Sequence, residues 1–163
     1  VRYVAGLPGP NDPAADADVV LIDCPLLLTP EAAAVLARAD GIVLTCRADP
    51  LSLRTVPAAA GVLAAARVHN PRLELIGVLI GGYNSRDAVQ GPMLARLRQM
   101  HGELLLEPPV PDDPAVRDWP LTPGAALPPG RAADAFAVVA RRLRDLIRRL
   151  SGIALAARAD RRD

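Results

Sequence analysis

The chain has 163 residues and a formal net charge of +1, so it is long enough for a domain with a substantial core, and it is not a globally basic nucleic-acid binder. Apolar residues make up 51% of it and aromatic residues only 2%, so the core must be built from aliphatic side chains, which suits helices packed on a sheet. All 19 basic residues are arginines. Because the sequence holds no lysine, it excludes a phosphate-binding loop of the form G-x-x-x-x-G-K-[ST] within these residues.

The two cysteines, Cys24 and Cys46, each stand at the end of an apolar run. This placement is typical of a reduced intracellular protein, in which both serve as small buried side chains, and not of a disulfide framework. The two histidines are scattered and do not combine with the cysteines into a metal-ligand pattern. No signal peptide and no bilayer-spanning apolar run is visible, so we expect a cytoplasmic protein.

The first short segment, residues 1–5, is expected to form an edge strand, and residues 6–13 have the composition of a loop. Residues 19–22 (VVLI) form an apolar run without alternation, which predicts a strand buried on both faces. Asp23 closes this strand at its carboxyl end, where open parallel sheets bind ligands. From these residues alone, Asp23 is either a ligand-binding acid or the cap of a turn.

A helix is expected over residues 29–38, with Thr29 as its N-cap and Pro30 at its first position. Residues 41–46 predict the next buried strand. An alanine-rich helix follows over residues 52–68; it tolerates Pro57 in its early turns and ends at Asn70-Pro71.

The second half repeats this alternation. Residues 73–80 and 103–106 predict strands, and residues 91–101 predict the helix between them. Residues 108–130 contain eight prolines, so we expect a long irregular loop or lid there. The last helix is expected over residues 132–150, with an apolar stripe spaced three and four apart. Its arginine-rich remainder has three interpretations that stay open: a solvated face, a DNA-phosphate surface or a membrane surface.

Strands that alternate with helices predict an α/β fold with a mostly parallel sheet and helices on both faces. We expect one domain over residues 1–150 and a poorly anchored tail over residues 151–163.

Four segments, in order and over residues 18–150, carry a resemblance to the ParA/MinD family of P-loop ATPases, which partition chromosomes and plasmids and position division sites. They are VVLIDCP at 19–25, ADGIVL at 39–44 followed by DPLSL at 49–53, NPRLELIGVL at 70–79 followed by YNSR at 83–86, and VPDDPAVR at 110–117. The resemblance implies a partial P-loop NTPase-like fold and, in the complete protein, a bound ATP and Mg²⁺.

The resemblance also assigns roles to single residues. It implies that Asp23 is the catalytic, magnesium-side acid and acts through water, and that Cys24 and Pro25 form the switch that senses the γ-phosphate. Asn84 and Arg86 would face the adenine base from one side. Pro111 and Asp113 would close the other side of the base.

Asp113 would accept a hydrogen bond from the amino group of the base, although an aspartate before Pro114 is also an ordinary turn starter. Arg96, Arg98 and Arg117 fall near positions where partition ATPases carry arginines that touch DNA phosphates without reading the sequence.

These residues predict the carboxyl-terminal part of a ParA-like ATPase for chromosome or plasmid partitioning or division positioning. As the resemblance implies, the whole protein would form a homodimer across ATP-Mg²⁺ and associate with non-specific DNA and a ParB-like or other cargo-side partner. Two departures bear on activity: Leu26 replaces the second proline of the switch, and the phosphate-binding loop is missing. With such a loop upstream of Val1 the protein is an ATPase; without it these residues are inactive.

The alternative is a degenerate, nucleotide-free relative that serves as a binding or scaffold module. A third hypothesis, a membrane-associated positioning protein of the MinD type, is not helped by the charged ending Asp160-Arg161-Arg162-Asp163.

Overall fold

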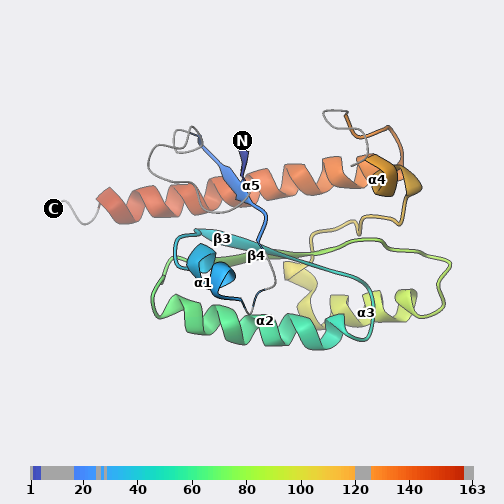
Figure 1. Ribbon diagram of the computed structural model, residues 1–163, viewed down its shortest axis with the longest axis horizontal. Helices are drawn as coiled ribbons and strands as arrows, with labels where there is room; N and C mark the ends of the chain where they lie inside the picture. The colour runs from blue at the N-terminus through green and yellow to red at the C-terminus, as the bar shows by residue number, and fades with distance from the viewer. Residues whose placement is uncertain (1, 5–16, 25–26, 28, 120–125, 160–163) are drawn as a thin grey trace. The chain divides into compact units, whose positions relative to one another are not determined.

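A computed structural model describes residues 2–4, 17–24, 27, 29–119 and 126–159. The chain divides into two compact units, the first formed by residues 1–41 and 57–74 and the second by residues 42–56 and 75–163. Strands and helices alternate along much of the chain, as Figure 1 shows, and this confirms the expected α/β class.

In the first unit, β1 (Arg2–Val4) pairs in parallel with β2 (Val20–Ile22), with Tyr3 opposite Leu21. Both strands lie where the sequence predicts them. The expectation that β2 is buried on both faces is wrong for Leu21, whose side chain is 50% exposed. The reason is the size of the ladder: two strands of three residues each bury little on either face.

The first unit also contains α1 (Pro30–Leu36), which begins as predicted. The Thr29 hydroxyl oxygen accepts a hydrogen bond from the Ala32 amide at 3.2 Å, and Pro30 occupies the first helical turn, where a missing N–H costs nothing.

The end of α1 is closed by a buried side chain. Asn70 is 4% exposed and follows α2 (Ser52–Arg67). Its Nδ2 donates to the carbonyl oxygens of Leu36 and Ala39, at 2.9 and 2.7 Å. The Leu36 carbonyl is one that the end of a helix leaves without an intrahelical partner, and Ala39 follows two residues after the C-cap Ala37, so one amide joins the end of α2 to the chain where it leaves α1.

The second unit is built on β3 (Gly41–Cys46) and β4 (Glu74–Ile80), which lie side by side. On the other side of β4, the amides of Leu106 and Val110 donate to the carbonyls of Val78 and Ile80, at 2.9 and 2.8 Å. The bridges made by this segment are parallel. The sheet therefore continues past β4 through residues 105–111.

The fourth strand, expected over residues 103–106, is not a regular strand in the structure. A 3₁₀ turn, η2 (Gly102–Leu104), leads to a single bridge at Leu105. The physical reason lies just downstream, because Pro108, Pro109 and Pro111 have no N–H to donate to a ladder.

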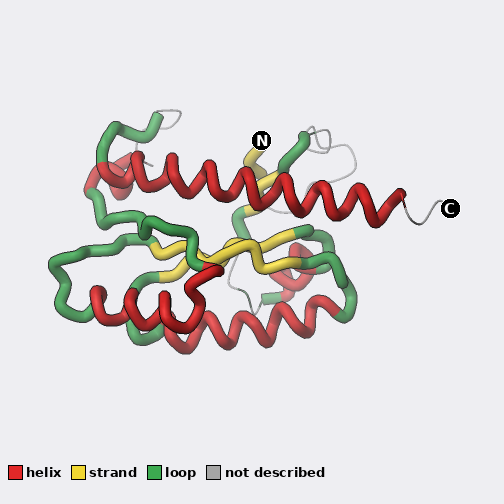
Figure 2. Tube along the Cα trace, turned by 180° about the vertical axis from the view of Figure 1, so that it is seen from behind, coloured by secondary structure: helices red, strands yellow, loops and turns green. Residues whose placement is uncertain are grey.

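Helices cover the two faces of this sheet: α3 (Gln90–His101) lies on one side of β3 and β4 and α5 (Arg131–Ala159) on the other, in both Figure 1 and Figure 2. Successive residues of β4 alternate between the faces. Val78 and Ile80 belong to the buried cluster that includes Leu94 and Leu97 of α3, whereas Leu79 packs with residues of α5. This confirms helices on both faces.

A close approach is built into β4 at Gly77. A Cβ placed there would lie 2.7 Å from Cγ of Leu106 and 3.0 Å from the Leu104 carbonyl oxygen. Glycine therefore lets the chain after η2 come against the strand.

Two expectations about the last third need correction. Residues 108–130 are not irregular throughout, because they contain the short helix α4 (Pro114–Asp118), which has Asp113 as its N-cap. The final helix continues to Ala159 and not to residue 150, since the alanines and Leu155 beyond Gly152 are strong helix formers.

Candidate functional site

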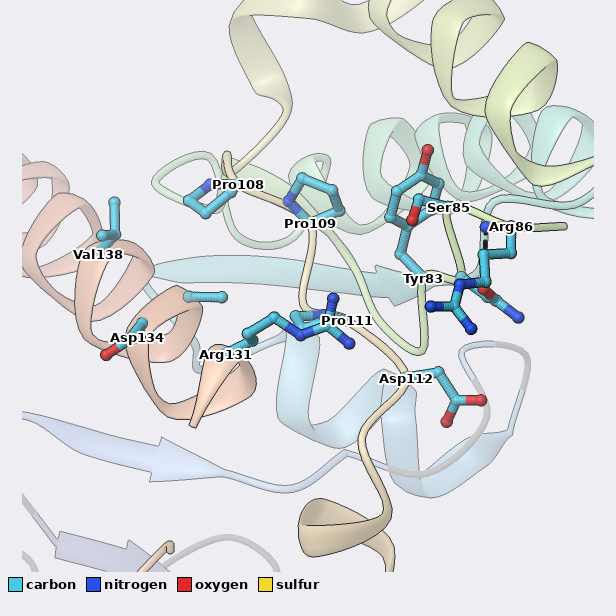
Figure 3. Close-up of a pocket in the computed structure, with 12 residues that line it drawn as sticks. Tyr83, Ser85, Arg86, Pro108, Pro109, Pro111, Asp112, Arg131, Asp134 and Val138 are labelled. Carbon is cyan, nitrogen blue, oxygen red and sulfur yellow. Dashed lines mark hydrogen bonds between the residues drawn. The ribbon is translucent and has the colours of Figure 1, made fainter. Parts of the chain in front are cut away.

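A pocket of about 670 Å³ opens in the second unit. Its lining comes from three segments: the loop after β4, the proline-rich segment after η2, and the first turns of α5 (Figure 3). The lining residues are Tyr83, Asn84, Ser85, Arg86, Pro108, Pro109, Pro111, Asp112, Arg131, Asp134, Ala135 and Val138.

The pocket lies where β4 and its neighbouring segment end. The Tyr83 amide donates to the Val110 carbonyl at 2.9 Å, and the Asp112 amide donates to the Tyr83 carbonyl at 2.8 Å. Backbone hydrogen bonds thus hold the two strand-following segments together at their carboxyl ends, which is where parallel sheets place ligand sites.

A sharp turn at Gly82 leads the chain from β4 into the pocket wall. Gly82 has φ of 61°, in the left-handed region that glycine adopts without strain. Nη2 of Arg47 donates to the Gly82 carbonyl at 3.3 Å, and a Cβ at Gly82 would lie 2.6 Å from Nη1 of the same guanidinium. The turn therefore suits glycine because of its backbone angle, and a Cβ there would also require the end of the Arg47 side chain to move.

The wall that follows is ordered by polar contacts. The Asn84 side-chain oxygen accepts from the Arg86 amide at 3.0 Å, and the Asn84 amide donates to Oε1 of Gln90 at 2.9 Å. Close by, the hydrogen bond from the Val89 amide holds the pKa of Asp87 below its ordinary value, with smaller contributions from Gln90 and from the charge of Arg47. Asp87 is therefore a carboxylate at neutral pH.

The lining combines flat apolar surfaces with a few polar groups. The prolines offer the flat surfaces, while Asp112 and Asp134 offer acceptor oxygens and Arg86 and Arg131 offer positive charge. A pocket with this composition can hold a planar, nitrogen-rich ring and an anionic group attached to it.

Three of the four residues predicted to contact a base come together here: Asn84, Arg86 and Pro111 line the pocket. The fourth, Asp113, is placed differently, since its Oδ1 accepts from the Ala115 amide at 3.0 Å and caps α4. Its neighbour Asp112 lines the pocket instead. The base-binding roles of all four remain predictions.

Asp23, the predicted magnesium-side acid, directly follows β2 in the first unit and is exposed. Burial and the charge of Asp23 raise the pKa of the adjacent Cys24. Pro25, the other predicted switch residue, lies outside the described residues. Within the described part of the chain, no group of three or more acidic, histidine or cysteine side chains is arranged to hold a metal ion.

Cys46 ends β3 and packs against the cluster of Val78, Ile80, Leu94 and Leu97. Burial raises the pKa of its thiol, although a hydrogen bond with Ser52 opposes this rise. Neither cysteine forms a disulfide, and both are half-buried.

The predicted DNA-contacting arginines have separate environments. Nη1 of Arg96 donates to Oε1 of Gln99 at 2.8 Å, whereas Arg98 forms a two-pronged ion pair with Glu107, at 2.7 and 3.2 Å, that raises the pKa of Arg98. Side chains two apart on α3 point in different directions, so these two do not share one face. Arg117 is exposed in the last turn of α4.

Sequence reasoning did not identify Tyr83, Asp112 and Arg131 as lining residues. A partial signal was present for Asp112, because adjacent residues of an extended segment face opposite ways and Asp113 followed by Pro114 is a helix-capping pair. Arg131 comes from a helix more than forty residues after Tyr83, and only the fold brings the two together.

Among the helices of the described residues, none has the length and apolar character needed to cross a membrane. No protein-family model matches the chain. The chromosome-partitioning ATPase Soj of Thermus thermophilus is 32% identical to it over 104 residues, which are 63% of this chain and 42% of Soj.

Among solved structures, cobyrinic acid a,c-diamide synthase from Mycobacterium smegmatis with bound ADP and magnesium matches with a TM-score of 0.50 and 25% identity. The match covers 71% of this chain and 52% of the synthase, so the chain spans about half the length of the proteins it matches, or less. The α/β fold, the similarity to Soj and the likeness to a nucleotide-binding synthase support the resemblance of this chain to the ParA/MinD family of P-loop ATPases.

Proposed function

We propose that this chain supplies the base-binding part of an ATP-Mg²⁺ site in a ParA-like ATPase for chromosome or plasmid partitioning. The observation that carries the proposal is the pocket at the carboxyl ends of β4 and its parallel neighbour, lined by Asn84, Arg86 and Pro111. The bound ADP and magnesium of the matching synthase support it, as does the similarity to Soj.

In this proposal the adenine ring lies against the prolines of the pocket wall. The side chains of Asn84 and Asp112 are acceptors for its exocyclic amino group. Oδ1 of Asp113 already accepts a hydrogen bond as the cap of α4, which leaves only Oδ2 for a ligand. Asp112, which lines the pocket, is therefore the stronger candidate.

The Mg²⁺ part of the proposal rests on Asp23. Magnesium takes oxygen ligands, keeps several waters and needs only one or two protein carboxylates beside the phosphates, so a single acid that acts through water fits its chemistry. Cys24 and Pro25 would follow the state of the γ-phosphate as the switch. Because the 163 residues hold no lysine, the lysine that would neutralise the phosphates lies outside them in this proposal.

We further propose that the whole protein dimerises across the nucleotide and associates with non-specific DNA and a cargo-side protein partner. Arg96 and Arg117 are the better candidates for DNA phosphates, because the guanidinium of Arg98 already pairs with Glu107. DNA binding of this kind weakens steeply as salt rises.

A second candidate function is a nucleotide-free binding or scaffold module. Two features of the sequence favour it: the absence of lysine and the presence of Leu26 after Pro25. The two candidates differ in whether the pocket of the second unit binds an adenine nucleotide.

Calorimetry with adenosine, ATP and GTP tests this difference on the chain and on the full-length product of its gene. We expect adenosine and ATP to bind and GTP to bind at least about 10-fold more weakly, since a donor or acceptor that the bound base covers and leaves unpaired costs roughly 1–3 kcal/mol. Asp112→Asn should reduce the preference for adenine, and Arg54→Ala, on the exposed face of α2, is the matched control.

Saturable adenosine binding that Asp112→Asn weakens and Arg54→Ala leaves unchanged supports the ATPase site. No adenosine or ATP binding by either protein supports the nucleotide-free module and overturns the first candidate.

A further inference from the structure

We propose that Gln90, acting together with Asp87, is a positioning residue for the pocket: it fixes the wall formed by residues 84–86 to the start of α3. The inference rests on the proposed function, in which that wall contacts a base. Gln90 itself does not line the pocket.

Both ends of the Gln90 amide are used. Its Oε1 accepts from the backbone amide of Asn84 at 2.9 Å, and its Nε2 donates to Oδ2 of Asp87 at 3.2 Å. Gln90 is the first residue of α3, so one side chain links a helix of the core to the pocket wall.

Asp87 completes the link from the other side. Its Oδ1 accepts from the backbone amides of Val89 and Gln90, at 2.8 and 3.4 Å. Val89, the N-cap residue of α3, makes no side-chain cap, so Asp87 supplies the acceptor for the amides at this helix end. The carboxylate therefore anchors itself on α3 and orients the Gln90 amide.

The link reaches the lining residues through Asn84. With its own amide held by Gln90, the Asn84 side-chain oxygen accepts from the Arg86 amide at 3.0 Å. Asn84, Ser85 and Arg86 are all exposed, so no buried apolar side chain anchors this wall. Hydrogen bonds hold it in place: the Gln90 side chain connects it to α3, and the Asp87 amide also donates to the Asn84 carbonyl at 3.1 Å.

The arrangement predicts that the loss of Gln90 lowers the affinity for the ligand and hardly changes the unfolding midpoint of the unit. A residue needed only for stability would lower the unfolding midpoint of the whole unit. A positioning residue loosens the wall, weakens the ligand and leaves the midpoint almost unchanged, because the core cluster under α3 does not include it.

The first test replaces Gln90 by a residue of similar length without hydrogen-bonding groups, Gln90→Met. Gln99→Met is the matched control, because Gln99 lies on the same helix, is exposed and bonds only to Arg96 in the described contacts. We expect amide hydrogen exchange at Asn84 to accelerate about 10-fold and adenosine affinity to fall about 2- to 10-fold in Gln90→Met, the span expected for one lost hydrogen bond. Gln99→Met should change neither.

The second test is Gln90→Glu, with Gln99→Glu as its control. Near neutral pH the new carboxylate faces that of Asp87, so the two repel each other and the wall loosens. The charge of Asp87 raises the pKa of the introduced carboxyl. As the pH falls below that pKa, the protonated carboxyl donates to Oδ2 of Asp87, keeps an oxygen for the Asn84 amide and restores both contacts.

The Asn84 amide resonance should therefore titrate between about pH 4.5 and 7 in Gln90→Glu, and stay constant over this range in the wild type and in Gln99→Glu. Unchanged exchange at Asn84 in Gln90→Met, or a Gln90→Glu resonance that does not titrate, would overturn the inference. A different result separates the two proposals: the wild-type chain binds no adenosine, but Asn84 exchanges faster in Gln90→Met and its resonance titrates in Gln90→Glu. This result would overturn the proposed function and leave the positioning of the wall intact.

Discussion

The two compact units of this protein are held together in different ways. In the second unit, α3 and α5 cover the faces of the sheet with aliphatic side chains, among them Val78, Leu94 and Leu97. In the first unit, one buried amide, Asn70, bonds to carbonyls at the end of α1. Buried aliphatic side chains support both units, Val35, Leu36 and Leu63 among those of the first, and the first unit adds one buried side-chain amide to them.

The largest effect is expected from the apolar core. Leu97 is 0% exposed, so Leu97→Ala removes buried methyl groups and leaves a cavity, which should lower the free energy of unfolding by about 2–5 kcal/mol. Urea unfolding followed by circular dichroism measures it. Met100→Ala on the same helix is the control, with a change within about 0.5 kcal/mol because Met100 is 44% exposed. Equal losses in both variants would contradict the assignment of the core.

The second largest effect is expected from Asn70, the buried amide of the first unit. Asn70→Leu removes the donors to the Leu36 and Ala39 carbonyls, and a buried acceptor without a partner costs roughly 1–3 kcal/mol. The same urea experiment applies, with His69→Ala at the exposed neighbouring position as the control. An Asn70→Leu protein as stable as the wild type would show that the first unit does not depend on this amide.

A glycine-to-alanine substitution should change the stability of the protein in opposite directions at Gly77 and at Gly61. Gly77→Ala places a methyl group 2.7 Å from Leu106 and should destabilise the protein by about 1–3 kcal/mol. Gly61→Ala, on α2, meets nothing within 4 Å and should stabilise it by roughly 0.5–1 kcal/mol through helix propensity. Thermal unfolding of both variants measures the signs, and a shift in the same direction for both would contradict this packing.

The smallest effect is expected from the polar link of the second unit. Arg98 and Glu107 are paired but partly exposed, so the coupling energy from a double-mutant cycle with Arg98→Gln and Glu107→Gln should be about 0.2–1 kcal/mol. It should shrink as salt is added. A coupling energy as large as the loss of unfolding free energy in Asn70→Leu would contradict the expectation that this exposed ion pair contributes less than the buried amide.

Local chemistry made much of the fold predictable. The strand at 41–46 was predicted to the residue, and the Thr29-Pro30 start of α1 follows from the groups that a helix leaves unpaired. The half-exposed Leu21 was not predictable, because an apolar run indicates a strand and does not say how many neighbours cover it. The short helix α4 was missed among the prolines, although Asp113-Pro114 is a good helix start.

The site was predictable in part, for a similar reason. The family resemblance implied that Asn84, Arg86 and Pro111 lie around one ligand, and they do share a pocket. It named Asp113, whereas Asp112 lines the pocket, because that choice depends on the phase of an extended segment, which the backbone bonds between Tyr83 and Asp112 determine. The contribution of α5 depends on tertiary contacts that no local pattern contains.

The backbone bonds that join Tyr83 to Val110 and Asp112 have a consequence for how this protein can evolve. Main-chain groups are the same in nearly every residue type, so exchanging the side chains that line the pocket does not remove these backbone hydrogen bonds, which form its frame. The exposed side chains of Arg86 and Asp112 are therefore open to variation at little cost in folding, whereas Tyr83 also packs against the core cluster. A lineage with this frame can change what it recognises one side chain at a time.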